Sequence, residues 1–419
     1  MIKKIFILLL ASAYLYCITF NVFLNAYFRF PTPLLFGLPL VLLFGQKKQP
    51  FLYIKEALVL FFLNLLFYVI AQEDIKAAAV NLLIIIVAFL YFNFFVGTDH
   101  SRYKLSIIAF YSFLTLSGIV MLFDHVFRSQ VDNLRMILIG SPLAQSPSGI
   151  SAAIFSFGYQ MSALVPFLFI CSILYTRSWI ARAVVLFVCL VFVYFGMQRS
   201  ALLTFVVSSG LFLIFYYRYK AVLIIGILAV TAVGFSNFIL SQGASEYDNI
   251  FAKNERNAEE DRSKLMTENI EIYSDYPLGL MFYGKSWNDV TKYNKVYVGG
   301  LTSHNAYLMF ITYVGPFLGI TLLILLYSRI AKIFKIALSN VNDPKYALLL
   351  CLCFSFFSIS LNSMFHNGSL IGSEGATVFL YFAVLHRYNM HKATEDVIYE
   401  PIEIVQKPFK KNARVLSYE

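Results

Sequence analysis

Long apolar runs follow one another along most of the chain, and they constrain its fold more than any other feature. A helix needs about 20 mainly apolar residues to cross a bilayer core. Hydrophobic residues make up 59% of the 419 residues and charged residues only 13%, about half the charged fraction of soluble domains. Because a backbone in lipid must satisfy its own hydrogen bonds, and the runs lack the alternation of a membrane barrel, they indicate helices. We therefore predict an all-α, polytopic integral membrane protein with about 12 transmembrane helices and one long periplasmic loop.

Basic residues support this count because they gather in alternate connections between the expected spans. The spans are expected at residues 5–24, 34–45, 51–71, 78–97, 105–127, 150–175, 183–197, 201–217, 221–240, 306–328, 347–365 and 376–388. With a cytoplasmic N-terminus, these connections lie on the inner side, the short outer connections are poor in Lys and Arg, and both termini are cytoplasmic. The net charge of +10 then reflects topology, so no nucleic-acid partner is expected. The basic connections contain Lys47 and Lys48, Arg102 and Lys104, Arg177 and Arg182, Arg218 and Lys220, and Arg329, Lys332, Lys335 and Lys345.

The chain is expected to form one transmembrane domain over residues 1–391, followed by a cytoplasmic tail over residues 392–419. Two outer connections stand out. Residues 128–149 form a modest loop, and residues 241–304 form the long periplasmic loop, which is polar with interspersed tyrosines and glycines. Long polar segments between spans are usually functional. The long loop is therefore expected to contribute to a site.

One arginine interrupts the apolar stretch "VYFGMQRSALLTF", residues 193–205. The expected topology puts Arg199 in a tight turn between two spans at the outer membrane surface. It either extends toward lipid headgroups there or binds a substrate. Basic residues are disfavoured in short outer turns, and a guanidinium stays charged and matches a pair of phosphate oxygens. The position therefore favours Arg199 as a phosphate-binding residue.

The long loop contains a second candidate in "NAEEDRSKLMTENIEIYSDYPLG". Arg262, Met266, Ile270 and Tyr273 recur at helical spacing and would form one stripe of an amphipathic helix that ends at Pro277. If this stripe lies on the membrane, Arg262 faces the bilayer surface. Alternatively, Arg262 pairs with a neighbouring glutamate in a solvated charge run.

The third candidate is in "GGLTSHNAYLMFITYVGPFLG". Ser303 or Asn305 can cap the helix that is expected to become the tenth span. His304 would then lie at a helix N-terminus, where the helix dipole disfavours the imidazolium and attracts anions. We therefore expect a neutral ring that can accept a proton. Alternatively, His304 only helps to cap the helix.

Other chemistries find no support in the sequence. It has no Asp-x-Asp, no His-x-x-x-His, no cysteine pair in a polar loop and no glycine-rich phosphate loop, so no metal or other cofactor is expected. Asp124 with His125, near the outer end of the fifth span, and His366 in the last outer loop are weaker acid–base candidates. Two arginines and a neutral histidine at one membrane face suit a lipid-linked diphosphate and a hydroxyl nucleophile.

The order of these motifs resembles the O-antigen ligase and O-antigen polymerase (Wzy-type) superfamily of bacterial envelope glycosyltransferases. The resemblance covers most of the chain, with specific motifs at about residues 195–320. The first motif is the arginine turn. The second is the series in the long loop of an arginine, a helix and Pro-Leu-Gly. The third is "SHNAYLMFITYVGPFLGI", which leads into a span. The resemblance implies transfer of a glycan from undecaprenyl diphosphate at the periplasmic face of the bacterial inner membrane, without nucleotide sugar or metal.

The resemblance also implies roles for individual residues. Arg199 and Arg262 would bind the diphosphate and stabilise charge on the leaving group, and His304 would accept a proton from the attacking sugar hydroxyl. Asn305 and Tyr273 are the further substrate-binding residues. Attack on the sugar C1 opposite the departing phosphate predicts inversion. The segment "VGGLTSHN", which leads up to the helix start at His304, departs from the family because it carries no further acid or histidine.

Three functions follow from the resemblance and the span count. A polymerase joins lipid-linked repeat units, so donor and acceptor are both carried by undecaprenyl diphosphate in membrane lipid, and the family implies a chain-length regulator protein as partner. We favour this function because the spans are very aromatic and only the minimal motif is present. A ligase instead moves finished polymer onto lipid A core. A flippase for the same unit would place charges inside its spans and show repeated halves, whereas here the span interiors are almost free of charge and no internal repeat is seen.

Overall fold

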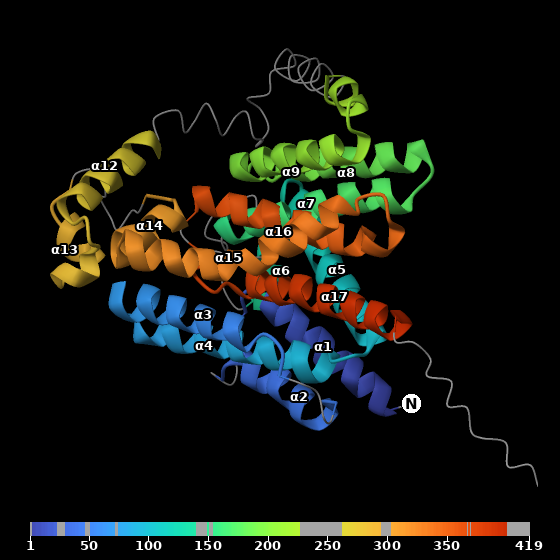
Figure 1. Cartoon of the computed structure of the whole chain (residues 1–419), viewed down its shortest axis with the longest axis horizontal. Coiled ribbons are helices and arrows are strands. Elements are labelled where there is room, and N and C mark those ends of the chain that lie inside the picture. Colours follow the sequence, from blue (N-terminus) through green and yellow to red (C-terminus); the bar gives the residue numbers. More distant parts are fainter. Residues whose placement is uncertain are drawn as a thin grey trace, which may run out of the picture.

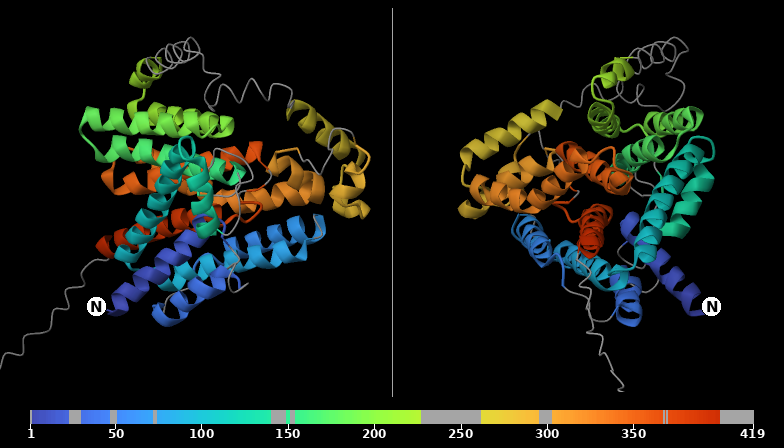
Figure 2. Two further views of the ribbon diagram at one scale, coloured as in Figure 1. Left: turned by 180° about the vertical axis from the view of Figure 1, so that it is seen from behind. Right: turned by 45° about the vertical axis from the view of Figure 1, so that its right-hand side comes forward.

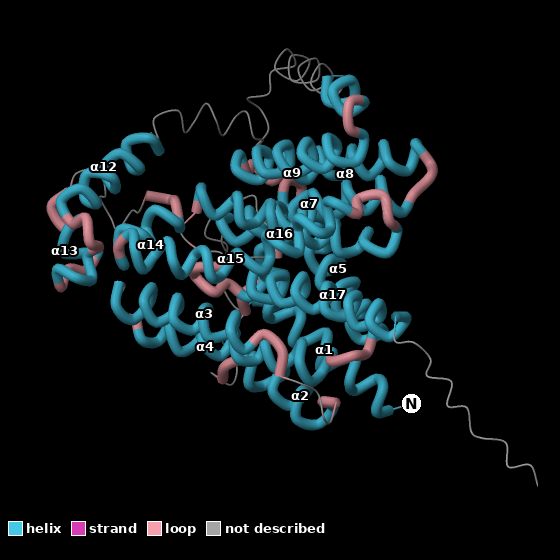
Figure 3. Tube along the Cα trace, in the orientation of Figure 1, coloured by secondary structure: helices cyan, strands magenta, loops and turns pink. Residues whose placement is uncertain are grey.

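The described part of the chain is built from helices. The computed structural model describes residues 2–22, 30–46, 51–71, 74–139, 149–150, 154–226, 262–294, 303–366, 368 and 370–399. Within these ranges the elements of secondary structure are helices joined by turns and loops (Figure 3). The structure therefore confirms the predicted all-α class.

The helices fall into three stretches of the chain. The first contains α1 (Ile2–Thr19), η1 (Pro33–Gly37), α2 (Leu38–Phe44), α3 (Ile54–Asn64), η2 (Leu65–Ala71), α4 (Ile75–Leu90), η3 (Tyr91–Val96), α5 (His100–Asp124) and α6 (Arg128–Ile139). The second contains α7 (Ile154–Tyr175), α8 (Trp179–Phe195) and α9 (Arg199–Tyr217). The third contains α12 (Arg262–Asp275), η5 (Leu280–Tyr283), α13 (Trp287–Thr291), α14 (Ala306–Val314), α15 (Pro316–Ser339), η7 (Pro344–Tyr346), α16 (Ala347–Asn362), η8 (Ser363–Phe365) and α17 (Gly375–Tyr399).

Helices of membrane-spanning length recur through the described residues. Seven are long and apolar enough to cross a bilayer, and two shorter apolar helices, Pro33–Phe44 and Trp179–Phe195, match the predicted spans 34–45 and 183–197. The chain is a polytopic membrane protein. The predicted count of about twelve stays a prediction, and most of the predicted span 221–240 lies outside the described residues.

Three stretches differ from expectation. The predicted tenth span 306–328 is not one helix, because Gly315 adopts a left-handed φ of +82° and Pro316 cannot donate the next helical hydrogen bond. The chain therefore breaks there between α14 and α15. The predicted outer connection 128–149 contains helix α6, and α17 continues to Tyr399, beyond residue 391.

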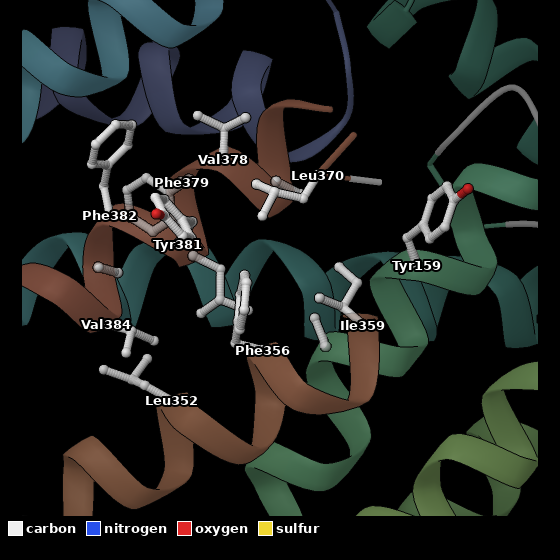
Figure 4. Packing of buried hydrophobic residues seen from close by; sticks show 14 of the residues in the cluster. Tyr159, Leu352, Phe356, Ile359, Leu370, Val378, Phe379, Tyr381, Phe382 and Val384 are labelled. Carbon is white, nitrogen blue, oxygen red and sulfur yellow. The ribbon is translucent and has the colours of Figure 1, made fainter. Parts of the chain in front are cut away.

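The core centres on α16 and α17. α7 packs along α16, α8 and α9, while α17 lies between α16 and the layer of α3 and α4 (Figure 1). Leucine, phenylalanine and tyrosine side chains from α16 and α17 interdigitate there, including Phe356, Phe379 and Tyr381 (Figure 4). Because α16 and the first half of α17 are apolar on nearly all sides, they can be buried within the bundle, whereas α15 exposes one side.

Basic connections gather at one end of the bundle. The start of α1, the α7–α8 turn and the ends of α9, α15 and α17 lie together at one end (Figures 1 and 2). We call this the basic end, because the described basic connections predicted for the inner side lie there. We call the opposite end, where α9 and α14 begin, the Arg199 end. The basic residues at the basic end include Arg177, Arg182, Arg218, Lys335 and Lys345.

A partly buried polar cluster joins three helices at the basic end. Arg329 on α15 donates to Glu56 on α3 across 2.7 Å, and its guanidinium lies 5.5 Å from the ring centroid of Tyr53. The Tyr53 hydroxyl shares a 3.0 Å hydrogen bond with Nδ1 of His386 on α17, whose Nε2 lies 2.7 Å from the carbonyl oxygen of Gly97. This cluster fixes α3 and α15 against α17.

Candidate functional site

Arg199 begins α9 directly after the predicted tight turn. α8 ends at Phe195 and α9 starts at Arg199, so only three residues connect them. Met197 in this turn has a φ of +53°, a left-handed conformation that costs a bulky residue roughly 1 kcal/mol or more. Gln198, at the N-cap position, makes no side-chain hydrogen bond that caps α9. Strained backbone of this kind persists only where surrounding contacts hold it.

Those contacts come from α7 and from the segment after α16. A Cβ placed on Gly158 of α7 would lie 3.0 Å from Oε1 of Gln198, so glycine lets α7 approach the turn closely. Ser200 Oγ and His366 Nε2 share a 3.1 Å hydrogen bond, and both side chains are buried. The ring of Tyr159 meets the His366 ring edge-on at 5.2 Å. His366, a weaker candidate in the sequence, is thus brought directly to the Arg199 turn.

His304 stands just before α14, as predicted. Asn305 is the N-cap, since its side chain accepts a 3.0 Å hydrogen bond from the backbone N–H of Leu308. His304 is half-buried and has a φ of +52°. Arg199 and His304 therefore both lie at the start of a helix. A left-handed residue, Met197, precedes Arg199, and His304 is itself left-handed.

One segment, at the end of α16 and just after it, contacts both helix starts. Tyr307, in the first turn of α14, donates a 2.8 Å hydrogen bond to the backbone carbonyl of Ser360 near the end of α16. His366, just after η8, bonds to Ser200 in the first turn of α9. The segment 360–366 therefore links α9 with α14, and Arg199 and His304 belong to the same end of the bundle.

Helix α12 of the long loop docks on α14. Asn269 is fully buried, accepts a 2.6 Å hydrogen bond from the Thr312 hydroxyl and directs its amide nitrogen to Met309 Sδ at 3.1 Å. Leu265 and Ile272 share this packed face. The sequence pattern does not reveal this face, because an asparagine counts as polar in a hydrophobic periodicity even where it is buried. Figures 1 and 2 show α12 beside α14 at the Arg199 end.

The predicted amphipathic stripe of α12 is partly exposed. Met266 and Ile270 are exposed, and Tyr273 is half-buried. Arg262 begins the helix seven residues before Asn269, at nearly the same angular position around the helix axis. The Arg262 side chain and Glu259 lie outside the described residues, so the role of Arg262 stays a prediction.

Asp124 and His125 have structural partners. Asp124 and Arg135 form an ion pair at 3.0 Å with both side chains fully buried, and Arg135 Nε also donates to the Gly149 carbonyl. His125 Nε2 lies 3.0 Å from the carbonyl oxygen of Phe195. This pair fixes α6 against α5. Removal of Arg135 would leave Asp124 buried without its ion pair, whereas removal of Asp124 would leave Arg135 paired with Asp132 at 2.9 Å. Across the described ranges, no three His, Cys, Asp or Glu side chains gather as metal ligands would.

One segment of the chain is similar to a known protein family. Residues 183–324 match the family model described as O-antigen ligase. The match covers about a third of the 419 residues and contains Arg199, Arg262 and His304. It confirms, over that segment, the resemblance to the O-antigen ligase and polymerase superfamily. No curated protein matches the chain.

Proposed function

We propose that this membrane protein joins oligosaccharide repeat units carried on undecaprenyl diphosphate, as an inverting, metal-independent O-antigen polymerase at the periplasmic face of the bacterial inner membrane. One observation carries the proposal. Within the part of the chain that matches the O-antigen ligase family, the starts of α9 and α14 contact the same segment, 360–366. The predicted phosphate-binding Arg199 and the predicted base His304 thus share one end of the bundle.

The donor diphosphate suits this end on electrostatic grounds. The N-terminus of a helix carries a partial positive charge and free backbone N–H groups, which attract phosphate oxygens. α9 adds the guanidinium of its first residue to that field. Arg199 and Arg262 then bind the diphosphate and stabilise the negative charge that grows on it as the glycosidic bond breaks.

His304 acts on the acceptor in this proposal. Its imidazole takes the proton of the attacking sugar hydroxyl, whose oxygen forms the new bond to C1 of the donor glycan. The C1–oxygen bond to the diphosphate breaks at the same time, and undecaprenyl diphosphate leaves with the electron pair. Attack from the face opposite the leaving group inverts the configuration at C1. Asn305 fixes the helix start beside the base, and Tyr273 contacts the glycan.

Polymerase and ligase differ in the acceptor. The matching family is described as O-antigen ligase, which supports transfer of finished polymer to lipid A core as the second candidate. The polymerase is favoured by the very aromatic spans that carry only the minimal motif. A polymerase would also work with a chain-length regulator protein.

Deletion of the gene separates the candidates, with surface lipopolysaccharide resolved on a gel. A polymerase deletion leaves single repeat units attached to core. A ligase deletion leaves bare core, with polymer retained on its lipid carrier. Unchanged ladders in the deletion strain would contradict both functions, and restored ladders on re-expression of the intact chain control for effects on neighbouring genes.

A further inference from the structure

His366 is placed to control the turn that carries Arg199. Its side chain is 3% exposed, and its Nε2 shares a 3.1 Å hydrogen bond with Oγ of Ser200, the residue after Arg199. The two residues are 166 positions apart in the sequence. The contact therefore joins the segment after α16 to the first turn of α9.

The start of α9 needs an external contact of this kind. α14 is capped by Asn305, whereas Gln198 provides no side-chain cap to α9. The preceding Met197 holds a left-handed φ of +53°. Neither a side-chain cap nor a relaxed turn fixes the first turn of α9. The hydrogen bond between Ser200 and His366 therefore helps to hold this turn in place.

His366 is itself fixed by packing. The Tyr159 ring lies edge-on to it at 5.2 Å, and a Cβ on Gly158 would lie 3.7 Å from its Nε2. Asn362, four residues earlier, donates to the Gly158 carbonyl at 3.3 Å and to Ser162 Oγ at 2.7 Å. These bonds hold the end of α16 against α7, so the position of the imidazole is set by helices other than α9.

We propose that His366 is a positioning residue for Arg199, which sets the first turn of α9 through Ser200 and so fixes the direction in which the guanidinium meets a diphosphate. The proposal rests on the proposed glycan transfer. It assigns no proton transfer to His366. A residue in this role acts on catalysis only through Arg199, and this dependence can be measured.

The test is a double-mutant cycle on initial rates, with the full chain in lipid nanodiscs and the undecaprenyl-diphosphate-linked repeat unit as substrate. The four proteins are the unchanged chain, His366→Leu, Arg199→Lys and the double variant. We expect His366→Leu to lower kcat/KM about tenfold in the unchanged chain. In the Arg199→Lys background, where the phosphate contact is already weakened, the same change should lower kcat/KM less than about twofold. An equal loss in both backgrounds would overturn the proposal.

Two further variants separate positioning from proton transfer and from misfolding. His366→Gln places a hydrogen-bonding group near the position of Nε2 and should keep most of the activity, whereas a Gln variant as inactive as His366→Leu would refute a positioning role. Ser200→Ala removes only one hydroxyl and should show the same dependence on Arg199 with a smaller loss.

The matched control is His386→Leu at the basic end. His386 is also buried and also bonds through Nε2, to the Gly97 carbonyl. Its loss should combine additively with Arg199→Lys, because it does not contact α9. An unchanged chain that forms no polymer from the repeat unit would instead contradict the proposed function, and this inference with it.

Discussion

Gly279 and Gly315 meet backbone to backbone at the Arg199 end. A Cβ on Gly279 would lie 2.6 Å from the carbonyl carbon of Val314, and one on Gly315 would lie 2.7 Å from the carbonyl carbon of Leu278. Both glycines adopt left-handed backbone, with φ of +99° and +82°. The Pro-Leu-Gly turn of the long loop therefore fits directly onto the break between α14 and α15. Two motifs that are separate in the sequence form one contact.

Substitution of Gly315 should release the loop. Gly315→Ala adds a Cβ that overlaps the Leu278 backbone and forces alanine into a left-handed conformation, so we expect a loss of about 2 kcal/mol or more. Limited proteolysis should then cut within residues 262–294 much faster. Gly284→Ala is the control, because Gly284 has a φ of +60° but no atoms within 4 Å of an added Cβ. Equal proteolysis of both variants would show that backbone strain, and not the contact with Leu278, explains the effect.

The two arginines should be individually required for chain extension. Arg199→Ala and Arg262→Ala are each expected to abolish polymer on a gel while membrane insertion stays normal. Lysine should replace either residue poorly, because a point charge cannot bind two phosphate oxygens as a guanidinium does. Arg218→Ala, at the other end of α9, is the control and should leave polymer length unchanged. Normal polymer in either Arg199→Ala or Arg262→Ala would remove that arginine from the site.

Acid should loosen the start of α13. The backbone N–H of Ser286, and then its side chain, hydrogen-bond to Asp289 and hold the pKa of this carboxyl below its ordinary value of 3.8. A lowered pKa means that the carboxylate stabilises the capping box above the ordinary pKa, and that this stabilisation is lost as the pH falls through the lowered pKa. Amide hydrogen exchange at Ser286 should therefore lose protection in acid relative to neighbouring amides. Asp289→Asn should lack this pH dependence, and an identical acid response in that variant would contradict the assignment.

The sequence predicted those features that depend on local chemistry. The start of α9 after the arginine turn and the Asn305 cap of α14 follow from apolar patterns and capping residues within a few positions. Contacts between distant segments could not be predicted in this way. Asn269 is buried because it meets Thr312, and His366 gains its importance from Ser200. The break at Gly315 was missed because apolar residues continue on both sides of it.

His304 is best tested with a substitution that keeps its backbone. Its φ of +52° is unfavourable for alanine but is readily adopted by asparagine. His304→Asn therefore removes the proposed base without straining the start of α14, whereas His304→Ala does both. We expect either variant to slow glycan transfer by about 100-fold or more, the range typical for loss of a general base, with donor binding retained. Asn305→Ala removes the cap together with a predicted substrate contact, so it should cost about 1 kcal/mol of stability and lower activity less than loss of His304 does. Turnover by His304→Asn equal to that of the unchanged chain would show that another group accepts the proton, whereas loss of donor binding would indicate that His304 contacts the diphosphate.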